Sequence, residues 1–150
     1  MKISGKTAVI TGAASGLGAA TAKRLHSLGA NILLADMNKD KGVALTEELG
    51  SNAVFAQMDV TKTQEVQAGM DLAMEKFKRI DILVNCAGTG FAMRTVGKDG
   101  PHDLEVFKTI ININLIGTFD ISSEAISADS VFCKILLYCS FLTVFDMHMS

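Results

Sequence analysis

Residues 11–18 read Thr11-Gly12-Ala13-Ala14-Ser15-Gly16-Leu17-Gly18, and they join an apolar run at 8–10 to a helical pattern over 19–25. The expected order is therefore strand, glycine-rich turn and helix. Three glycines at this spacing suit a backbone that turns sharply, admits a phosphate closely and packs the new helix on its strand, because each task excludes a side chain. The free N–H groups and the positive dipole end of the helix would then face an anionic pyrophosphate. The segment favours a dinucleotide-binding turn.

A carboxylate one strand later strengthens this interpretation. The spacing Gly-x-x-x-Gly-x-Gly differs from the commoner Gly-x-Gly-x-x-Gly, so the turn alone leaves open an ordinary connection between strand and helix. Asp36 lies eighteen residues after Gly18, at the end of the apolar run 31–35. A carboxylate there can accept both hydroxyls of an adenosine ribose and would repel a 2′-phosphate. The two features together predict NAD rather than NADP as the cofactor.

The composition permits a folded core and argues against several classes of partner. Of the 150 residues, 49% are hydrophobic and 20% are charged. The net charge is -2, the pI is about 5.9, and Lys and Arg form no cluster, so we expect no nucleic-acid partner. The three cysteines lack Cys-x-x-Cys spacing and suggest neither a disulfide framework nor a zinc site, so no metal is expected.

Strands and helices alternate along residues 7–85. Short apolar runs predict strands buried on both faces, and helical periodicity predicts the segments between them. In the first helix we expect Leu17, Ala20, Leu25 and Leu28 on roughly one side, and Thr61 or Thr63 is expected to cap the third. The expected strands are 7–11, 31–36, 53–58 and 82–85, and the expected helices are 16–28, 39–49 and about 63–79. The alternation predicts an α/β fold with a Rossmann-type, doubly wound parallel sheet.

A polar loop and a longer helix follow the fourth strand. The loop covers 89–101, and the helix, with Asp103 as a possible cap, runs from 102 to about 121. Two asparagines, Asn112 and Asn114, are expected to be buried on this apolar helix. An unpaired buried amide costs about 1 to 3 kcal/mol, so each should bridge neighbouring groups, and a purely structural bridge remains an open alternative.

Four motifs occur in order along the chain: the turn 11–18, Asp36, Asp59-Val60 and Asn85-Cys86-Ala87-Gly88. Together they make the chain similar to the short-chain dehydrogenase/reductase family over residues 1 to about 121. A narrower resemblance, to members acting on a 3-hydroxyacyl-CoA or a hydroxysteroid, rests on Cys86, on the long loop 89–101 and on His102-x-Leu104-Glu105.

The resemblance implies a role for each matched residue. Asp59 would accept from the adenine amino group and Val60 would pack beside the ring, although a turn-forming Asp59 and a merely space-filling Cys86 are the simpler alternatives. Asn114 matches the family's catalytic asparagine, whose backbone carbonyl helps to position a lysine through a water. The residues placed on the cofactor are Gly12, Ser15, Gly16, Leu17, Gly18, Asp36, Asp59, Val60, Asn85, Cys86 and Gly88.

The family's proton-transfer pair does not occur in this sequence. Family members use a serine after the fifth strand and a Tyr-x-x-x-Lys pair, in which the lysine lowers the pKa of the phenol. Here Tyr138 is the sole tyrosine, and Leu142 stands four residues later. One alternative alignment makes 135–137 the fifth strand and Ser140 the catalytic serine, with the tyrosine still beyond residue 150.

From Ser122 onward the sequence ceases to resemble the family. We therefore expect an incomplete fold of about four βα units over 1–121 and a divergent apolar tail over 122–150, as from truncation or altered splicing. The apolar run 131–145 is short for a membrane span, which needs roughly 20 residues, so a substitute core strand or short helix is favoured over an anchor. Without such cover, one edge of the fourth strand would be unpaired.

The resemblance implies an NAD-dependent oxidoreductase that interconverts a secondary alcohol and a ketone on a small-molecule substrate of acyl-CoA or steroid type. This chain would carry the cofactor half and be inactive alone, with the contacts of the family's homo-oligomer lost. The alternative is a non-catalytic dinucleotide-binding module that pairs with a full-length relative. Mitochondria are the implied compartment, without a cleavable transit peptide because residues 1–6 lead directly into a strand, and the cytoplasm is the alternative.

Overall fold

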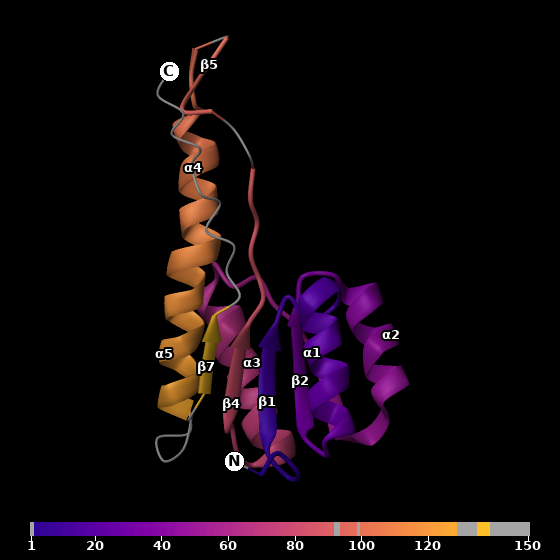
Figure 1. Ribbon diagram of the computed structural model, residues 1–150. Helices are drawn as coiled ribbons and strands as arrows, with labels where there is room; N and C mark the ends of the chain where they lie inside the picture. The colour runs from indigo at the N-terminus through magenta and orange to yellow at the C-terminus, as the bar shows by residue number, and fades with distance from the viewer. Residues whose placement is uncertain (1, 92–93, 99, 129–134, 139–150) are drawn as a thin grey trace.

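A parallel sheet with helices on both faces forms the body of the molecule (Figure 1). A computed structural model describes residues 2–91, 94–98 and 100–128, together with the backbone of 135–138. The strand order is β3-β2-β1-β4-β7, and every pairing in this sheet is parallel. The predicted doubly wound α/β fold is confirmed.

The first unit follows the predicted order of strand, turn and helix. β1 (Thr7–Thr11) is fully buried, α1 spans Gly16–Ser27, and β2 (Asn31–Asp36) returns beside β1. The predicted apolar side of α1 is wrong, because Leu17, Ala20 and Leu28 are exposed and the helix buries Gly18 and Ala22 instead. Small residues on the inner face let the helix lie close to the sheet.

The second helix begins at a side-chain cap, but the third does not. α2 (Lys39–Leu49) starts after Asn38, whose side chain accepts from the N–H of Lys41, and β3 spans Ala53–Gln57. α3 (Thr63–Phe77) begins after Lys62 with no side-chain cap, so neither Thr61 nor Thr63 caps it as predicted. Thr61 is instead bonded to Asp59, as described below.

After β4 (Ile82–Asn85), part of the predicted loop forms a hairpin, and the helix that follows is longer than predicted. β5 (Val96–Gly97) and β6 (Gly100–Pro101) pair as a short antiparallel hairpin, which projects beyond the sheet in Figure 1. A continuous helix then comprises α4 (Leu104–Ile111), the π-helical segment η2 (Asn112–Gly117) and α5 (Thr118–Ala128). It passes residue 121 because Ala125 is buried in the core shared with α3.

The fifth strand of the sheet comes from the predicted tail. β7 (Ile135–Tyr138) runs parallel to β4, with Ile82 opposite Ile135 and Asn85 opposite Tyr138. The open edge expected on β4 is therefore paired, as in the alternative alignment of 135–137. Ser140, Leu142 and the rest of the apolar run lie outside the described residues.

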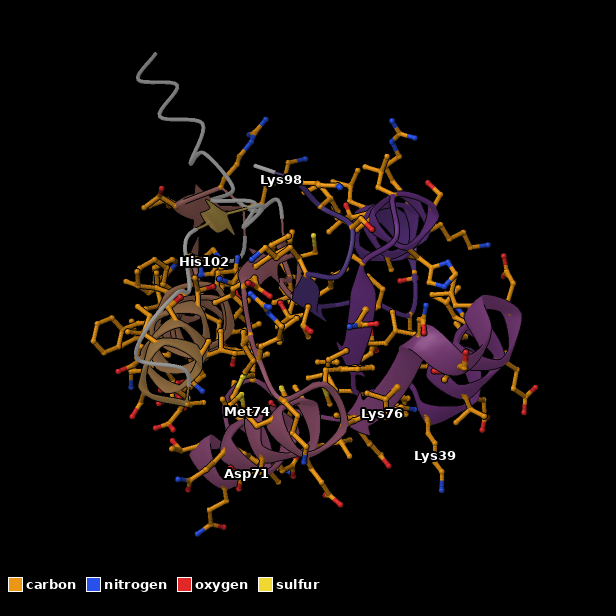
Figure 2. The ribbon with its side chains drawn as sticks, turned by 90° about the horizontal axis from the view of Figure 1, so that it is seen from below. Lys39, Asp71, Met74, Lys76, Lys98 and His102 are labelled. Atoms are coloured by element: carbon orange, nitrogen blue, oxygen red, sulfur yellow. The ribbon has the colours of Figure 1, made fainter. Side chains whose placement is uncertain are left out.

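Two apolar cores lie on opposite faces of the sheet. Ile10, Ile32 and Leu34 face α1 and α2, whereas Leu33 and Leu83 face α3 and α5. The turned view of Figure 2 shows these two layers, with Met74 of α3 on the side toward α5 and Lys39 and Asp71 pointing outward. Burial on both faces explains why the strands are continuous apolar runs.

Candidate functional site

A cavity of about 820 Å³ opens at the carboxyl ends of β1 to β4. This is where the strand order reverses between β1 and β4, the place at which doubly wound sheets form their ligand crevice. Of the predicted cofactor residues, those that line it are Gly12, Ser15, Gly16, Leu17, Gly18, Asp36, Asp59, Val60, Cys86 and Gly88. Met37, Met58, Thr89 and Ile113, which the sequence patterns did not single out, also line it.

The three glycines of the turn serve two purposes, close packing of the backbone and open space at the cavity. Gly12 has φ +61°, and a Cβ on it would stand 2.8 Å from the backbone N of Ala87. A Cβ on Gly18 would collide with the carbonyl oxygen of Gly12, so this glycine permits close packing of α1 on the turn. Gly16, with φ +52°, has open space where a side chain would project. Because α1 begins here, its positive end faces the cavity.

Thr11 ties the glycine turn to the loop after β4, and it is a contributor that the sequence patterns missed. Its buried hydroxyl accepts from the backbone N–H groups of Cys86 at 3.1 Å and Ala87 at 3.0 Å. A β-branched polar residue at the last position of a buried strand was the available signal. The bonds hold Cys86 and Ala87 at the cavity wall.

Asp36 is fixed at the cavity edge by two backbone donors. Its Oδ2 accepts from the N–H of Ala14 at 2.9 Å, and its Oδ1 accepts from the N–H of Asn38 at 2.8 Å. The first bond joins the end of β2 to the glycine turn. The carboxylate is thereby oriented before any ligand arrives.

Asp59 lies across the cavity from the glycine turn, after β3. Hydrogen bonds from the N–H and the hydroxyl of Thr61, at 3.0 and 2.7 Å, both end on Oδ1. These bonds, the backbone one first, lower the pKa of Asp59, and the nearby charge of Lys62 acts in the same direction. Asp59 is therefore a carboxylate at neutral pH, with Oδ2 outside the Thr61 bonds.

Asn114 projects from η2 and clasps the loop after β4. Its side-chain Oδ1 accepts from the N–H of Thr89 at 2.9 Å, and its Nδ2 donates to the carbonyl of Thr89 at 2.8 Å. Asn114 is 4% exposed, as expected for a bridging amide. The matching expectation for Asn112 is wrong, because this residue is exposed.

Asn85 is the predicted cofactor residue that does not line the cavity. It is 1% exposed, and its Nδ2 lies 3.5 Å from Oγ of Ser122 in α5. Its neighbours in the motif, from Cys86 to Gly88, reach the cavity wall in its place.

In the described part of the chain, no three or more His, Cys, Asp or Glu side chains gather closely enough to hold a metal ion. The helices of that part are all too short or too polar to cross a membrane.

Comparison with known proteins places this site in a family. The fold and the cavity define a doubly wound α/β domain with its site at the strand-order reversal. Residues 6–144 match the family model described as short chain dehydrogenase. The chain belongs to the short-chain dehydrogenase family.

The relatives bear out the narrower resemblance as well. The 3-hydroxyacyl-CoA dehydrogenase type-2 of Rattus norvegicus is 50% identical over 121 residues, which cover 79% of this chain and 46% of the relative. The enzyme of the same name from Homo sapiens is 46% identical over the same shares. The chain thus spans about half the length of the curated relatives it matches.

Solved structures agree. A 3-hydroxyacyl-CoA dehydrogenase type-2 from Mycobacterium avium matches with a TM-score of 0.77 and 36% identity, covering 83% of this chain and 48% of that one. A 7α-hydroxysteroid dehydrogenase in complex with NADH and 7-oxo glycochenodeoxycholic acid matches with a TM-score of 0.76 and 31% identity, covering 85% and 49%.

Proposed function

We propose that this chain binds NAD in the cavity and forms the cofactor half of a short-chain dehydrogenase. The observation that carries the proposal is the convergence of the glycine turn, Asp36 and Asp59 on one cavity at the carboxyl ends of the strands. The 7α-hydroxysteroid dehydrogenase with NADH, which shares the fold at 31% identity, supports a nicotinamide dinucleotide in this place.

The glycine turn and Asp36 would hold the adenosine and pyrophosphate portions. The N–H groups at the start of α1, near Ser15 and Leu17, would donate to the pyrophosphate, for which Gly16 leaves room. The Asp36 carboxylate would accept the ribose hydroxyls. Because it is anionic and held by two N–H groups, it would repel a 2′-phosphate and favour NAD over NADP.

Other residues that line the cavity would contact the adenine and nicotinamide rings. Asp59 would accept from the adenine amino group, with Val60 against the ring face. Cys86 and Gly88 would border the path toward the nicotinamide, and Asn114 would keep that border in place through Thr89.

The proposed chemistry of the family reaction is hydride transfer between a secondary alcohol and nicotinamide, on a 3-hydroxyacyl-CoA or a hydroxysteroid. The described residues of the cavity offer no phenol for the accompanying proton, and the sequence holds no Tyr-x-x-x-Lys pair. We therefore propose that residues 1–121 supply cofactor binding, that 122–128 and 135–138 add helix and strand cover, and that the chain alone has negligible turnover.

Calorimetric titration of the purified 150-residue chain with NAD and with NADP tests this proposal. We expect NAD to bind more tightly, and a spectrophotometric assay with 3-hydroxyacyl-CoA to show no NADH formation above background. Absence of NAD binding would refute the cofactor assignment. Robust turnover would refute the proposal that catalysis needs a Tyr-x-x-x-Lys pair.

A second candidate is a non-catalytic module that pairs with a full-length relative. The observation in its favour is the apolar surface along α4 to α5, where Leu115 is 58% and Phe119 is 73% exposed. Co-purification with a co-expressed full-length relative, lost on Phe119→Asp, would support this role. A chain that stays monomeric beside that relative would exclude it.

The compartment is also proposed by resemblance. We place the chain in mitochondria, with the cytoplasm as the alternative, and fractionation of cells that express the tagged chain decides between them.

A further inference from the structure

Asp59, the carboxylate assigned to the adenine ring, is supported by a second acid six residues later. Glu65 lies in the first turn of α3, and its Oε2 accepts from the backbone N–H of Asp59 at 2.8 Å. Its Oε1 binds the ammonium of Lys62 at 3.0 Å. Glu65 is not itself among the residues that line the cavity.

Lys62 lies between the carboxylates of Glu65 and Asp59. Its Nζ lies 3.8 Å from Oδ2 of Asp59, the oxygen outside the Thr61 bonds, and nearer to Glu65. The ammonium is therefore shared unequally between two carboxylates. With the Glu65 charge removed, Lys62 would pair with Oδ2 of Asp59 and occupy the acceptor that a ligand needs.

Packing fixes the same segment from behind. Val60 lies against Gly117 of η2, where a Cβ would stand 2.9 Å from Cγ2 of Val60. Met58 lies against Gly69 of α3, where a Cβ would collide with its terminal methyl group. The backbone of 58–60 therefore has little room to move, and the hydrogen bond from Asp59 to Glu65 completes its support.

We propose that Glu65 is a positioning residue that sets recognition of the purine 6-amino group by holding the Asp59 backbone and keeping Lys62 off the Asp59 carboxylate. The inference rests on the proposed function of the cavity. Adenine offers an N–H donor at position 6, which suits Oδ2 of Asp59, whereas hypoxanthine offers an oxygen that the carboxylate repels. Glu65 should thus govern the preference for NAD over nicotinamide hypoxanthine dinucleotide.

The test compares the dissociation constants of these two dinucleotides for four chains by calorimetry. In Glu65→Gln the amide oxygen can still accept from Asp59, but the charge that holds Lys62 is gone. We expect NAD to bind about three- to ten-fold more weakly, the range of one hydrogen bond, with little change for the hypoxanthine analogue. The double variant Lys62→Met/Glu65→Gln should recover most of the preference, because no ammonium then competes. Asp71→Asn, on the outward side of α3, is the control that removes a charge from the same helix and should behave as wild type.

The outcomes separate this inference from the proposed function. If wild type binds NAD and Glu65→Gln keeps the full preference, the role of Glu65 is wrong and the cofactor assignment stands. Loss of affinity for both dinucleotides in equal measure, without rescue by Lys62→Met, would also overturn it. Wild type that binds neither dinucleotide would remove both proposals. If Glu65→Gln unfolds, Thr61→Val takes its place in the test, because it removes the hydroxyl that donates to Asp59. It must then lower the preference for NAD over the hypoxanthine analogue, and an unchanged preference would overturn the proposed positioning of Asp59.

Discussion

The hydroxyl of Thr11 is the smallest group on which the shape of the cavity depends. It is buried and satisfies two backbone N–H groups of the loop after β4. Thr11→Val keeps the shape but leaves the N–H of Ala87 without this acceptor, whereas the N–H of Cys86 keeps its bond to the Thr11 carbonyl at 3.2 Å. We expect the variant to lower the free energy of unfolding by about 1 to 3 kcal/mol. Urea denaturation measures this loss. Thr11→Ser, which keeps the hydroxyl, should lose less, and equal losses would contradict the hydrogen-bond explanation.

Asp36 sets the charge at the ribose end. Asp36→Asn removes the anion while an acceptor remains, so NAD affinity should fall about ten-fold or more and the discrimination against NADP should largely disappear. Paired calorimetric titrations with NAD and NADP measure both effects. A variant that still rejects NADP as strongly as wild type would show that another group makes this choice.

Among the elements, η2 is the one that brings a helix side chain to the cavity loop. Asn114→Ala would free the N–H and the carbonyl of Thr89. We expect faster exchange of the Thr89 amide hydrogen and weaker NAD binding, with the exchange of β1 amides unchanged. Hydrogen exchange followed by mass spectrometry or NMR measures this. Unchanged exchange at Thr89 would mean that the clasp does not hold the loop.

The helix after the hairpin offers two sides with helical spacing, and the more apolar one is not the buried one. Leu104, Leu115 and Phe119 share one side, and all three are exposed. The buried side follows the same period from Ile110 through Asn114 and Gly117 to Ile121 and Ala125. Periodicity alone could not choose between the two sides, because the side that packs carries an amide and a glycine.

For the molecule as a whole, the amino ends of β1 and β4 are joined by a buried carboxylate. Burial alone would raise the pKa of Asp81, but hydrogen bonds from Arg79, from the N–H of Thr7 and from Lys6 lower it to about 2. A lowered folded-state pKa means stabilisation that is full above the ordinary value of 3.8 and is lost as the pH falls toward 2.

The corresponding variant is Asp81→Asn. At pH 7 it should lower the free energy of unfolding by about 2 kcal/mol, from the pKa difference between the folded and unfolded chains. The difference from wild type should shrink as the pH falls below about 4. Urea denaturation across this range measures it, with the exposed Asp71→Asn as the control. A difference that does not vary with pH would contradict the linkage.

The sequence by itself determined the strands, most helix limits, the glycine turn and the acid after β2, because these depend on local periodicity, on glycine conformations and on which side chains fit at strand ends. Tertiary structure decided the rest. The two N–H groups on Asp36, the clasp of Asn114 on Thr89, the link from Glu65 to Asp59 and the pairing of β7 with β4 each join segments whose distance in space no local pattern encodes. Apolar character showed that 135–138 needed cover, but only packing against the edge of β4 specified a strand there, because a short apolar run satisfies its backbone equally well as helix or strand until a partner is present.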